Sequence, residues 1–525
     1  MTVNLPIQMA IAAPSKSHGL PAANPGEKVT VTLSRTFHGS GRQYDSGALY
    51  VTDPFGVLIT KIPFSFGEYT RGQFKFHLGK HNLTGVYQVI VSFKETKIKG
   101  LPVDKSPFEG VPDDREIFGS FFLKGAYPSI VTQRVTYQAT ITNKAVNSIR
   151  NIQMFIAVPP SLPSRQEILD LKIKPTSGHQ ANDLSGNNWV HFTHNELPPK
   201  SHLTFGYSAL IRSRSIRYEL PTATRKIQVP SGLKAYTKPE QFIDSHHHLI
   251  KDLAKDIART NPRPIQFIKA AMRKVHKILK YERQEEERGA AYAIEKRKGD
   301  CTEFAALFTA LCRAYGLPAR LQAGFGFGGK SFERHAWSEV WIRGLWVPVD
   351  PTWHGSSGLL GITSRHVPII IGNWMSNRIR QELSYSWRAV KGTTSPDLSV
   401  QWKVQQVAKV STDSGRPKDV APVQLQASVP DAIPSGKNLP MKVTVTPIPK
   451  GRVPLEYMLL TATVSDGEMD NVVAIEPLPA NLQAPLNLRL NVPMPSVVPK
   501  TTLSLRLWVD RKPTSTVWRK TIGLL

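Results

Sequence analysis

Hydrophobic and polar residues alternate along much of this chain. Apolar side chains recur at every second position in three stretches, at about 25–93, 115–230 and 423–525. Examples are the alternating segments 85–91, 135–141 and 503–507. Successive side chains of a strand point to opposite faces, so this spacing is typical of antiparallel sheets with one buried face. We expect three antiparallel β-sandwiches.

The spacing becomes helical between 236 and 390. One stripe of apolar residues at intervals of three and four follows Pro262 and Pro264, which mark a helix start. Its members are Ile265, Ile268, Met272, Val275, Ile278 and Leu279. A second stripe runs to Tyr315 and is followed by Gly316 and Pro318, two helix stop signals, which predicts a helix over about 301–315. This segment is therefore the mixed α+β part of the chain.

The predicted fold class is α+β, with a mixed core flanked by immunoglobulin-like antiparallel β-sandwich domains. A chain of 525 residues is long enough for about three to five such units. The expected domains are an N-terminal extension (1–24), a β-sandwich (25–110), a second β-sandwich (111–235), the α+β core (236–410), a linker (411–422) and a C-terminal β-sandwich (423–525).

Composition indicates a folded chain, with 40% hydrophobic and 20% charged residues and no apolar run near the ~18 residues of a membrane span. The net charge is +27, but the basic residues are spread and do not interleave with aromatics. We therefore expect no specific nucleic-acid partner, and at most a weak association with anionic cell-surface polymers. The first residues lack the charged start of a secretory signal. Two locations stay open: the cytoplasm, or the cell envelope and exterior if a signal was removed.

The two cysteines, Cys301 and Cys312, exclude a sulfur-ligated zinc site. On one helix their Cα atoms would lie roughly 16 Å apart at ~1.5 Å per residue, too far for a disulfide. Cys312 lies within the apolar stripe and is expected in the core. We predict neither a metal nor another cofactor.

Cys301 is expected in the first turn of its helix. Asp300 before it and Glu303 after it have the spacing of a capping box. Unpaired N–H groups and the positive end of the helix dipole favour a thiolate there, and they offer a donor to an oxyanion.

A hairpin is expected to bring His335 close to Asp350. Residues 333–342 and 345–350 alternate as strands around Arg343-Gly344. With a two- or four-residue loop, Trp337 faces Asp350, and His335 is the diagonal neighbour of Asp350 on the same face. A three-residue loop would place Asp350 on the opposite face. A carboxylate beside an imidazole fixes its tautomer, and the imidazole can then activate a thiol.

Four ordered blocks of sequence resemble the transglutaminase-like core of the papain-like superfamily. They are Gly299-Asp300-Cys301-Thr302-Glu303-Phe304-Ala305, Arg313-Ala314-Tyr315-Gly316-Leu317-Pro318-Ala319-Arg320, His335-Ala336-Trp337-Ser338-Glu339-Val340 and Trp346-Val347-Pro348-Val349-Asp350-Pro351-Thr352. The resemblance implies a thiol acyltransferase or hydrolase in which Cys301 is the nucleophile, His335 the base and Asp350 the residue that orients the base. It also implies a protein or peptide substrate that presents glutamine side chains. The first sandwich resembles macroglobulin-like domains.

The chain departs from animal transglutaminases in two respects. Those enzymes have a tryptophan upstream of the cysteine as a second oxyanion donor, but no tryptophan occurs between 204 and 336 here. Tyr281 and Tyr292 are both candidates for that role, and the sequence does not choose between them. No acidic calcium-binding pattern follows Asp350, so activation by calcium is not expected.

Two further motifs are interpreted as structural. Residues 324–331 match the G-x-x-x-x-G-K-[ST] phosphate-loop pattern, but a strand and not a helix is expected from Phe332, so we interpret them as a loop between strands. The three histidines at 246–248 could bind a metal ion, but they begin a helix, where their side chains point in different directions. We therefore interpret them as a solvated helix start.

Three functions stay open on the sequence alone. One is glutamine crosslinking or deamidation through a thioester. The second is a cysteine peptidase or amidase with the same triad, and the third is a catalytically silent adhesive or scaffold protein.

Overall fold

The computed structural model describes most of the chain. The described residues are 7–17, 20–35, 46–52, 58–65, 71–78, 85–93, 116–123, 130–162, 165–183, 186–218, 220, 229–356, 358, 360–372, 382–388, 395–407, 423–434, 437–447, 458–465, 470–478, 485–494, 500–509 and 512–524. The expected linker at 411–422 lies outside these residues.

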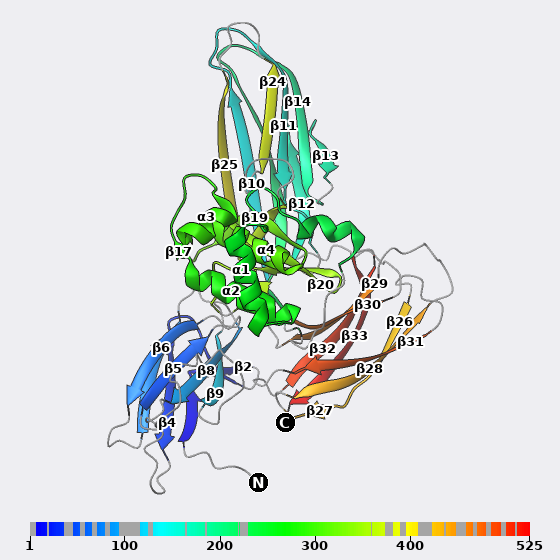
Figure 1. Ribbon diagram of the computed structural model, residues 1–525. Coiled ribbons are helices and arrows are strands. Elements are labelled where there is room, and N and C mark those ends of the chain that lie inside the picture. The colour runs from blue at the N-terminus through cyan, green and yellow to red at the C-terminus, as the bar shows by residue number, and fades with distance from the viewer. Residues whose placement is uncertain are drawn as a thin grey trace.

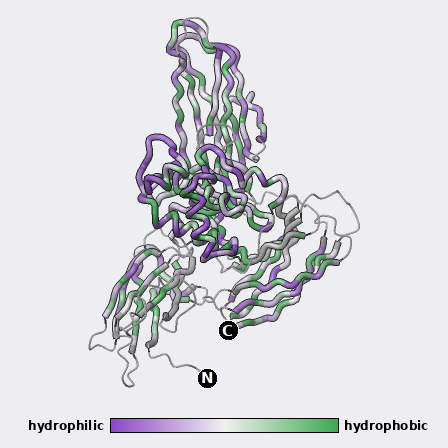
Figure 2. Tube along the Cα trace, viewed as in Figure 1, coloured by the Kyte–Doolittle hydropathy of each residue, from purple (hydrophilic) through white to green (hydrophobic). Residues whose placement is uncertain are grey.

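Three β-sandwiches surround a central α+β unit (Figure 1). One sandwich rises from the helices at the top of the view, while the N-terminal and C-terminal sandwiches lie below them on opposite sides. Green and purple alternate along many strands in Figure 2, as expected for sheets with one buried face. Within the part of the chain that the structure describes, no helix has the length and apolar character needed to cross a membrane.

The first sandwich packs a three-stranded sheet against a six-stranded one around a shared apolar core. The smaller sheet has the order β1 (Ile7–Ala12), β4 (Lys28–Arg35) and β7 (Arg71–His77). The larger has the order β2 (Ser15–Ser17), β3 (Leu20–Ala23), β9 (Glu116–Leu123), β8 (Gly85–Phe93), β5 (Ser46–Thr52) and β6 (Leu58–Ser65). The sequence placed 116–123 in the second sandwich, and this was wrong, because β9 pairs with β8 and β3.

The second sandwich consists of two four-stranded sheets. One has the order β12 (Gln166–Lys174), β15 (His202–Arg214), β10 (Ile130–Thr142) and β25 (Asp397–Gln406), and the other has the order β13 (His179–Asn182), β14 (Asn188–Leu197), β11 (Ile149–Val158) and β24 (Leu383–Arg388). Strands β24 and β25 were assigned to the core from the sequence. They pair instead with β11 and β10, because half-buried strands need a neighbour and the edges of this sandwich supply one.

The C-terminal sandwich has a seven-stranded and a three-stranded sheet. The larger sheet has the order β22 (Gly361–Ile362), β16 (Ile216–Tyr218), β30 (Asp470–Leu478), β29 (Met458–Ser465), β32 (Lys500–Val509), β33 (Lys512–Leu524) and β27 (Ala432–Ile433). The smaller has the order β26 (Val423–Ser428), β28 (Asn438–Pro447) and β31 (Leu486–Pro493). Two short strands from outside the C-terminal region, β16 and β22, thus extend this sandwich.

The central unit places four α-helices beside a four-stranded sheet. The helices are α1 (His248–Thr260), α2 (Pro264–Ile278), α3 (Gly289–Lys296) and α4 (Cys301–Tyr315), preceded by the 3₁₀ helix η2 (Ser231–Thr237). The sheet has the order β21 (Leu345–Val349), β20 (Phe332–Ile342), β19 (Ala319–Phe327) and β23 (His366–Ile371), and β17 (Lys280–Tyr281) pairs separately with β18 (Lys298–Gly299). Helix α4 packs against β19 and β20 and is the most deeply buried helix.

Candidate active site

The start of α4 is held by a dense set of hydrogen bonds. The Asp300 carboxylate accepts bonds from the backbone N–H of Thr302 at 2.9 Å and from its hydroxyl at 2.7 Å. The Glu303 carboxylate accepts from the backbone N–H of Asp300 at 3.0 Å, which completes the predicted capping box. Gly299 is needed beside it, since a Cβ there would lie 2.3 Å from the Glu303 Cβ. The Cys301 backbone is therefore fixed at the first position of the helix.

Polar contacts also fix the position of α4 relative to β20. The Ser338 hydroxyl donates to the Ala305 carbonyl at 3.1 Å, and the Thr309 hydroxyl donates to Ser338 at 2.9 Å. All three residues are buried. Because His335 lies three residues before Ser338 on the same strand, these bonds also fix the position of Cys301 relative to His335.

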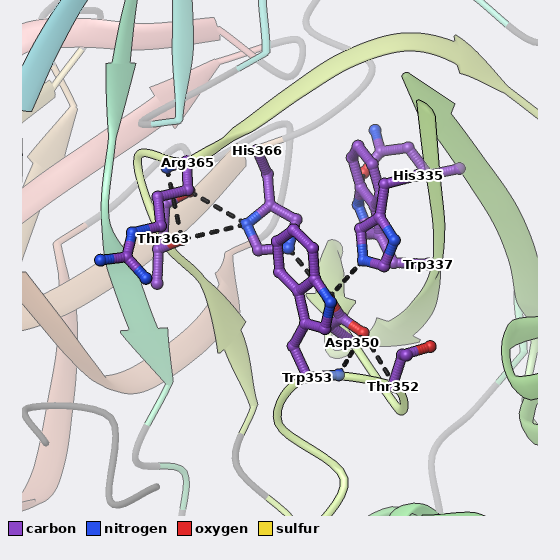
Figure 3. Close-up of polar contacts among 9 residues, drawn as sticks. His335, Trp337, Asp350, Thr352, Trp353, Thr363, Arg365 and His366 are labelled. Atoms are coloured by element: carbon purple, nitrogen blue, oxygen red, sulfur yellow. Dashed lines mark hydrogen bonds and ion pairs between the residues drawn. The ribbon is translucent and has the colours of Figure 1, made fainter. Parts of the chain in front are cut away.

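The hairpin β20–β21 has the predicted register. Val340 pairs with Val347, and Glu339 pairs with Pro348, across a two-residue turn. This register brings the His335 Nε2 to 2.8 Å from the Asp350 Oδ2 (Figure 3). The remaining ring nitrogen, Nδ1, is available to Cys301, whose side chain hydrogen-bonds to His335. The three predicted residues therefore lie together.

Burial and charge act in opposite directions on His335. Burial lowers the pKa of His335, but the Asp350 carboxylate and the Cys301 side chain raise it by more. The net result is a pKa of about 10. Because this value exceeds the ordinary 6.5, the pairing stabilises the fold fully below pH 6.5, and the contribution is lost as pH rises through about 10. His335 thus favours the imidazolium form over the neutral pH range.

Trp353 covers the imidazole ring. The Trp353 and His335 ring centroids lie 4.0 Å apart with an interplanar angle of 12°. Gly326 makes room for this stack, because a Cβ there would lie 2.5 Å from the Trp353 ring and 3.0 Å from the His335 Cβ. Only 3% of Cys301 and 2% of His335 is exposed, so bulk water has little access to the pair.

Asp350 is fully buried, and four N–H groups surround its carboxylate. Oδ1 accepts from the backbone N–H groups of Thr352 at 2.9 Å and Trp353 at 3.0 Å, while Oδ2 faces His335 and also His366 at 3.0 Å. Burial raises the pKa of Asp350, but the two histidines lower it well below its usual value. The nearest ligand atoms of His335, Asp350 and His366 lie within 4.8 Å of one another, a spacing that suits a metal ion. We assign them to a hydrogen-bond network, because N–H donors already satisfy both carboxylate oxygens.

The structure distinguishes the two candidate tyrosines. Tyr281 pairs with Gly299, two residues before Cys301, and its side chain is 53% exposed. Burial of its hydroxyl, then the charges of Cys301 and Asp300, raise its pKa to about 12, so it keeps its proton. Tyr292 hydrogen-bonds instead to Lys298. Tyr281 is therefore the tyrosine beside the thiol.

Other sequence interpretations can be compared with the structure directly. Cys312 is fully buried as expected, and burial raises the pKa of its thiol. Phe332 begins a strand and not a helix, which agrees with rejection of the phosphate loop, although 324–327 belongs to β19 and not to a loop. Of the three histidines at 246–248, His247 has its Nε2 atom 3.1 Å from the Glu295 carboxylate.

Trp346 and Trp353, which flank Asp350 in the sequence, lie in different surroundings, and only Trp353 stacks on His335. Trp346 instead packs edge-on against Trp341, with ring centroids 5.4 Å apart.

Two features of this site were not predicted from the sequence. His366 is a lone histidine in a buried strand, and sequence patterns do not distinguish it from a core histidine. The second feature is a buried ionic cluster behind the sheet, in which Glu339 binds Arg165 at 2.5 Å and Arg320 at 2.8 Å. Arg165 comes from the second sandwich, so no local pattern could have linked it to Glu339.

The fold and the site define a multidomain, β-rich protein with a transglutaminase-like α+β core. Residues 251–351 match the family described as "Transglutaminase-like superfamily", a segment that runs from α1 through Cys301 and His335 to the residue after Asp350. This segment is a transglutaminase-like domain.

Similar proteins share only part of the chain. Kyphoscoliosis peptidase of Mus musculus is 37% identical over 79 residues, and that of Homo sapiens is 38% identical over 81 residues. Each alignment covers 14% of this chain and 12% of the relative. A solved structure from Cytophaga hutchinsonii, described as a proposed cysteine protease, aligns with 54% of this chain and 94% of its own at 19% identity and a TM-score of 0.38.

Proposed function

We propose that this protein is a thiol acyltransferase or hydrolase of the transglutaminase type, acting on glutamine side chains of proteins. The observation that carries the proposal is the buried arrangement in which His335 lies between Asp350 and Cys301 under the Trp353 ring. A thiol, an imidazole and a carboxylate in this order form a unit for nucleophilic catalysis.

In the proposed reaction, the proton of the Cys301 thiol already resides on His335 as the imidazolium, and the Cys301 sulfur attacks the carboxamide carbon as a thiolate. The backbone N–H of Cys301, at the first position of α4, donates to the developing oxyanion. The C–N bond then breaks, His335 gives its proton to the leaving nitrogen, and ammonia departs. An amine or water then attacks the thioester while His335 removes a proton from it, the C–S bond breaks, and the sulfur leaves as the thiolate beside the His335 imidazolium.

Exclusion of water favours transfer to an amine over hydrolysis. The triad atoms are nearly inaccessible, and Tyr281 is the exposed side chain next to Cys301. We infer that the acyl donor approaches from the Tyr281 side. Cysteine peptidase activity is the second candidate, because the matched relatives are named as peptidases.

Incubation with a glutamine-rich protein and a fluorescent primary amine tests the proposal. Covalent label together with released ammonia is the expected result, and ammonia alone would identify a deamidase. New peptide termini without ammonia would show that the protein is a peptidase. A Cys301→Ala protein in parallel controls for contaminating activity.

Replacing Tyr281 by phenylalanine is expected to lower kcat by about 100-fold. In this proposal the hydroxyl, which stays protonated, donates a second hydrogen bond to the oxyanion, and single donors of this kind contribute about 100- to 1000-fold. Tyr292→Phe is the matched control, because its hydroxyl contacts Lys298 and should not affect turnover. Equal rates for Tyr281→Phe and the unmodified protein would exclude Tyr281 from the oxyanion site.

A further inference from the structure

One oxygen of Asp350 is shared by two histidines from different strands. His335 on β20 and His366 at the start of β23 approach Oδ2 with their Nε2 atoms, at 2.8 and 3.0 Å. Figure 3 shows both rings directed at the carboxylate. His366 is 2% exposed, and the reaction described above gives it no role.

The surroundings of His366 favour a neutral ring. Its Nδ1 lies 3.1 Å from the Thr363 hydroxyl, which can donate to it, and at the longer distance of 3.3 Å from the Thr363 backbone carbonyl oxygen. The Nε2 faces a carboxylate and must therefore carry the proton. Burial lowers the pKa of His366 below its usual value, which agrees with a neutral ring. His366 is thus a neutral N–H donor to the same oxygen that holds the His335 imidazolium.

We propose that His366 is a positioning residue that tunes His335, because its N–H takes up part of the Oδ2 negative charge and so weakens the hold of Asp350 on the imidazolium proton. The inference rests on the proposed function, in which His335 must both accept a proton from Cys301 and release it to the leaving nitrogen. General acid–base groups work best when their proton affinity lies near the working pH. A carboxylate in a dry site that served His335 alone would bind this proton too tightly.

The effect is electrostatic because the carboxylate cannot easily turn. Oδ1 is held by two backbone N–H groups whether or not His366 is present. Besides Asp350 and His366, the titratable groups near His335 are Cys301 on α4 and His354 after β21, with Tyr281 on β17 beyond the thiol. On β19 the residue paired with His335 is Gly324, which carries no titratable group. Beside His366, the Arg365 guanidinium lies over the Phe327 ring. No other group occupies the position of His366 on Oδ2 among the residues that the structure describes.

The second sandwich holds the turn that carries His366. The Ser364 backbone N–H donates to the Ser215 hydroxyl at 2.9 Å, and the Gln133 side-chain amide donates to the Ser364 carbonyl at 2.8 Å. Gln133 lies on β10, and Ser215 lies directly after β15. Both contacts are buried, so a β-domain far from Cys301 in sequence fixes the tuning residue.

The test compares His366→Leu, which removes the donor, with His366→Gln, which can present an amide N–H at a similar reach. The first readout is the rate of Cys301 alkylation by iodoacetamide against pH, which requires no acyl substrate. The second is kcat and KM for the glutamine protein. His354→Gln is the matched control, a buried histidine whose ring lies 5.8 Å from that of His366. Thr363→Val, which removes the hydroxyl that selects the tautomer, serves if His366→Leu does not fold.

In His366→Leu, the alkaline step of the alkylation profile, at which His335 loses its proton, should move up by about one pH unit. The kcat should fall roughly tenfold at unchanged KM. His366→Gln should return both values toward those of the unmodified protein, and Thr363→Val should shift the step in the same direction by less. An unmoved step in both His366→Leu and Thr363→Val overturns the inference, as does an equal shift in His354→Gln. If instead the unmodified protein and His335→Ala give the same alkylation profile, the Cys–His pair itself is absent and the proposed function fails.

Discussion

Replacing Cys301 by alanine should abolish turnover, and replacing His335 by alanine should lower kcat by about 10⁴-fold or more. Both residues take part in every bond-making step of the proposed reaction. Because such residues act as one unit, loss of either removes most of the rate enhancement that the whole unit supplies. Asp350→Ala should cost about a hundredfold less, because the carboxylate orients His335 but does not transfer the proton itself. Ammonia release from a glutamine protein measures all three.

Cys312→Ala is the matched control for loss of a buried thiol. Cys312 lies eleven positions along the same helix and is fully buried in the core. Its replacement should lower stability while leaving kcat within a few-fold. A His335→Ala protein with full activity would remove the histidine from the mechanism.

Replacing Glu339 by alanine should destabilise the protein by about 3–5 kcal/mol, the usual cost of leaving buried charges without their partner. Glu339 is fully buried and binds both Arg165 and Arg320, which are themselves less than 10% exposed. Loss of the carboxylate leaves two guanidinium groups facing each other. The midpoint of unfolding, followed by tryptophan fluorescence, measures the effect.

The matched control is Glu167→Ala, which removes an exposed ion pair with Arg212 and should cost under about 1 kcal/mol. Acid provides a second test. Burial raises the pKa of Glu339, but Arg320 and Arg165 lower it to below the ordinary value of 4.5. Its stabilising contribution is therefore present above pH 4.5 and is lost as pH falls through the lower, folded value. Equal midpoints for Glu339→Ala and Glu167→Ala would show that the cluster contributes no more than a surface pair.

Local chemistry predicted the elements around the proposed triad. The helix 301–315 was predicted from its apolar stripe, capping box and Gly316 stop, and the structure has those limits. The His335–Asp350 contact followed from the two-residue turn and the period of a strand. Both arguments use neighbours within about twenty residues, where steric and hydrogen-bond rules act directly.

Features that depend on distant segments could not be predicted in this way. Strand β25 alternates like any half-buried strand, and nothing in its residues names β10, more than 250 positions earlier, as its partner. The same holds for Arg165 and Glu339, which are 174 positions apart, and for the turn at Ser364 that Gln133 holds. Such contacts are selected by the assembled shape of two domains.

The short strand β16 limits the order in which parts of the chain can fold. It lies between the second sandwich and the core, yet it pairs in parallel with β30, and Arg217 donates to the Asn471 side chain across 254 positions. Val472 of β30 also packs into the apolar core that surrounds α4. During synthesis, the residues of the proposed triad therefore leave the ribosome long before β30, which pairs with β16 and contributes Val472 to their apolar core. A nascent chain cannot pair β16 with β30 until residues 470–478 have been synthesised.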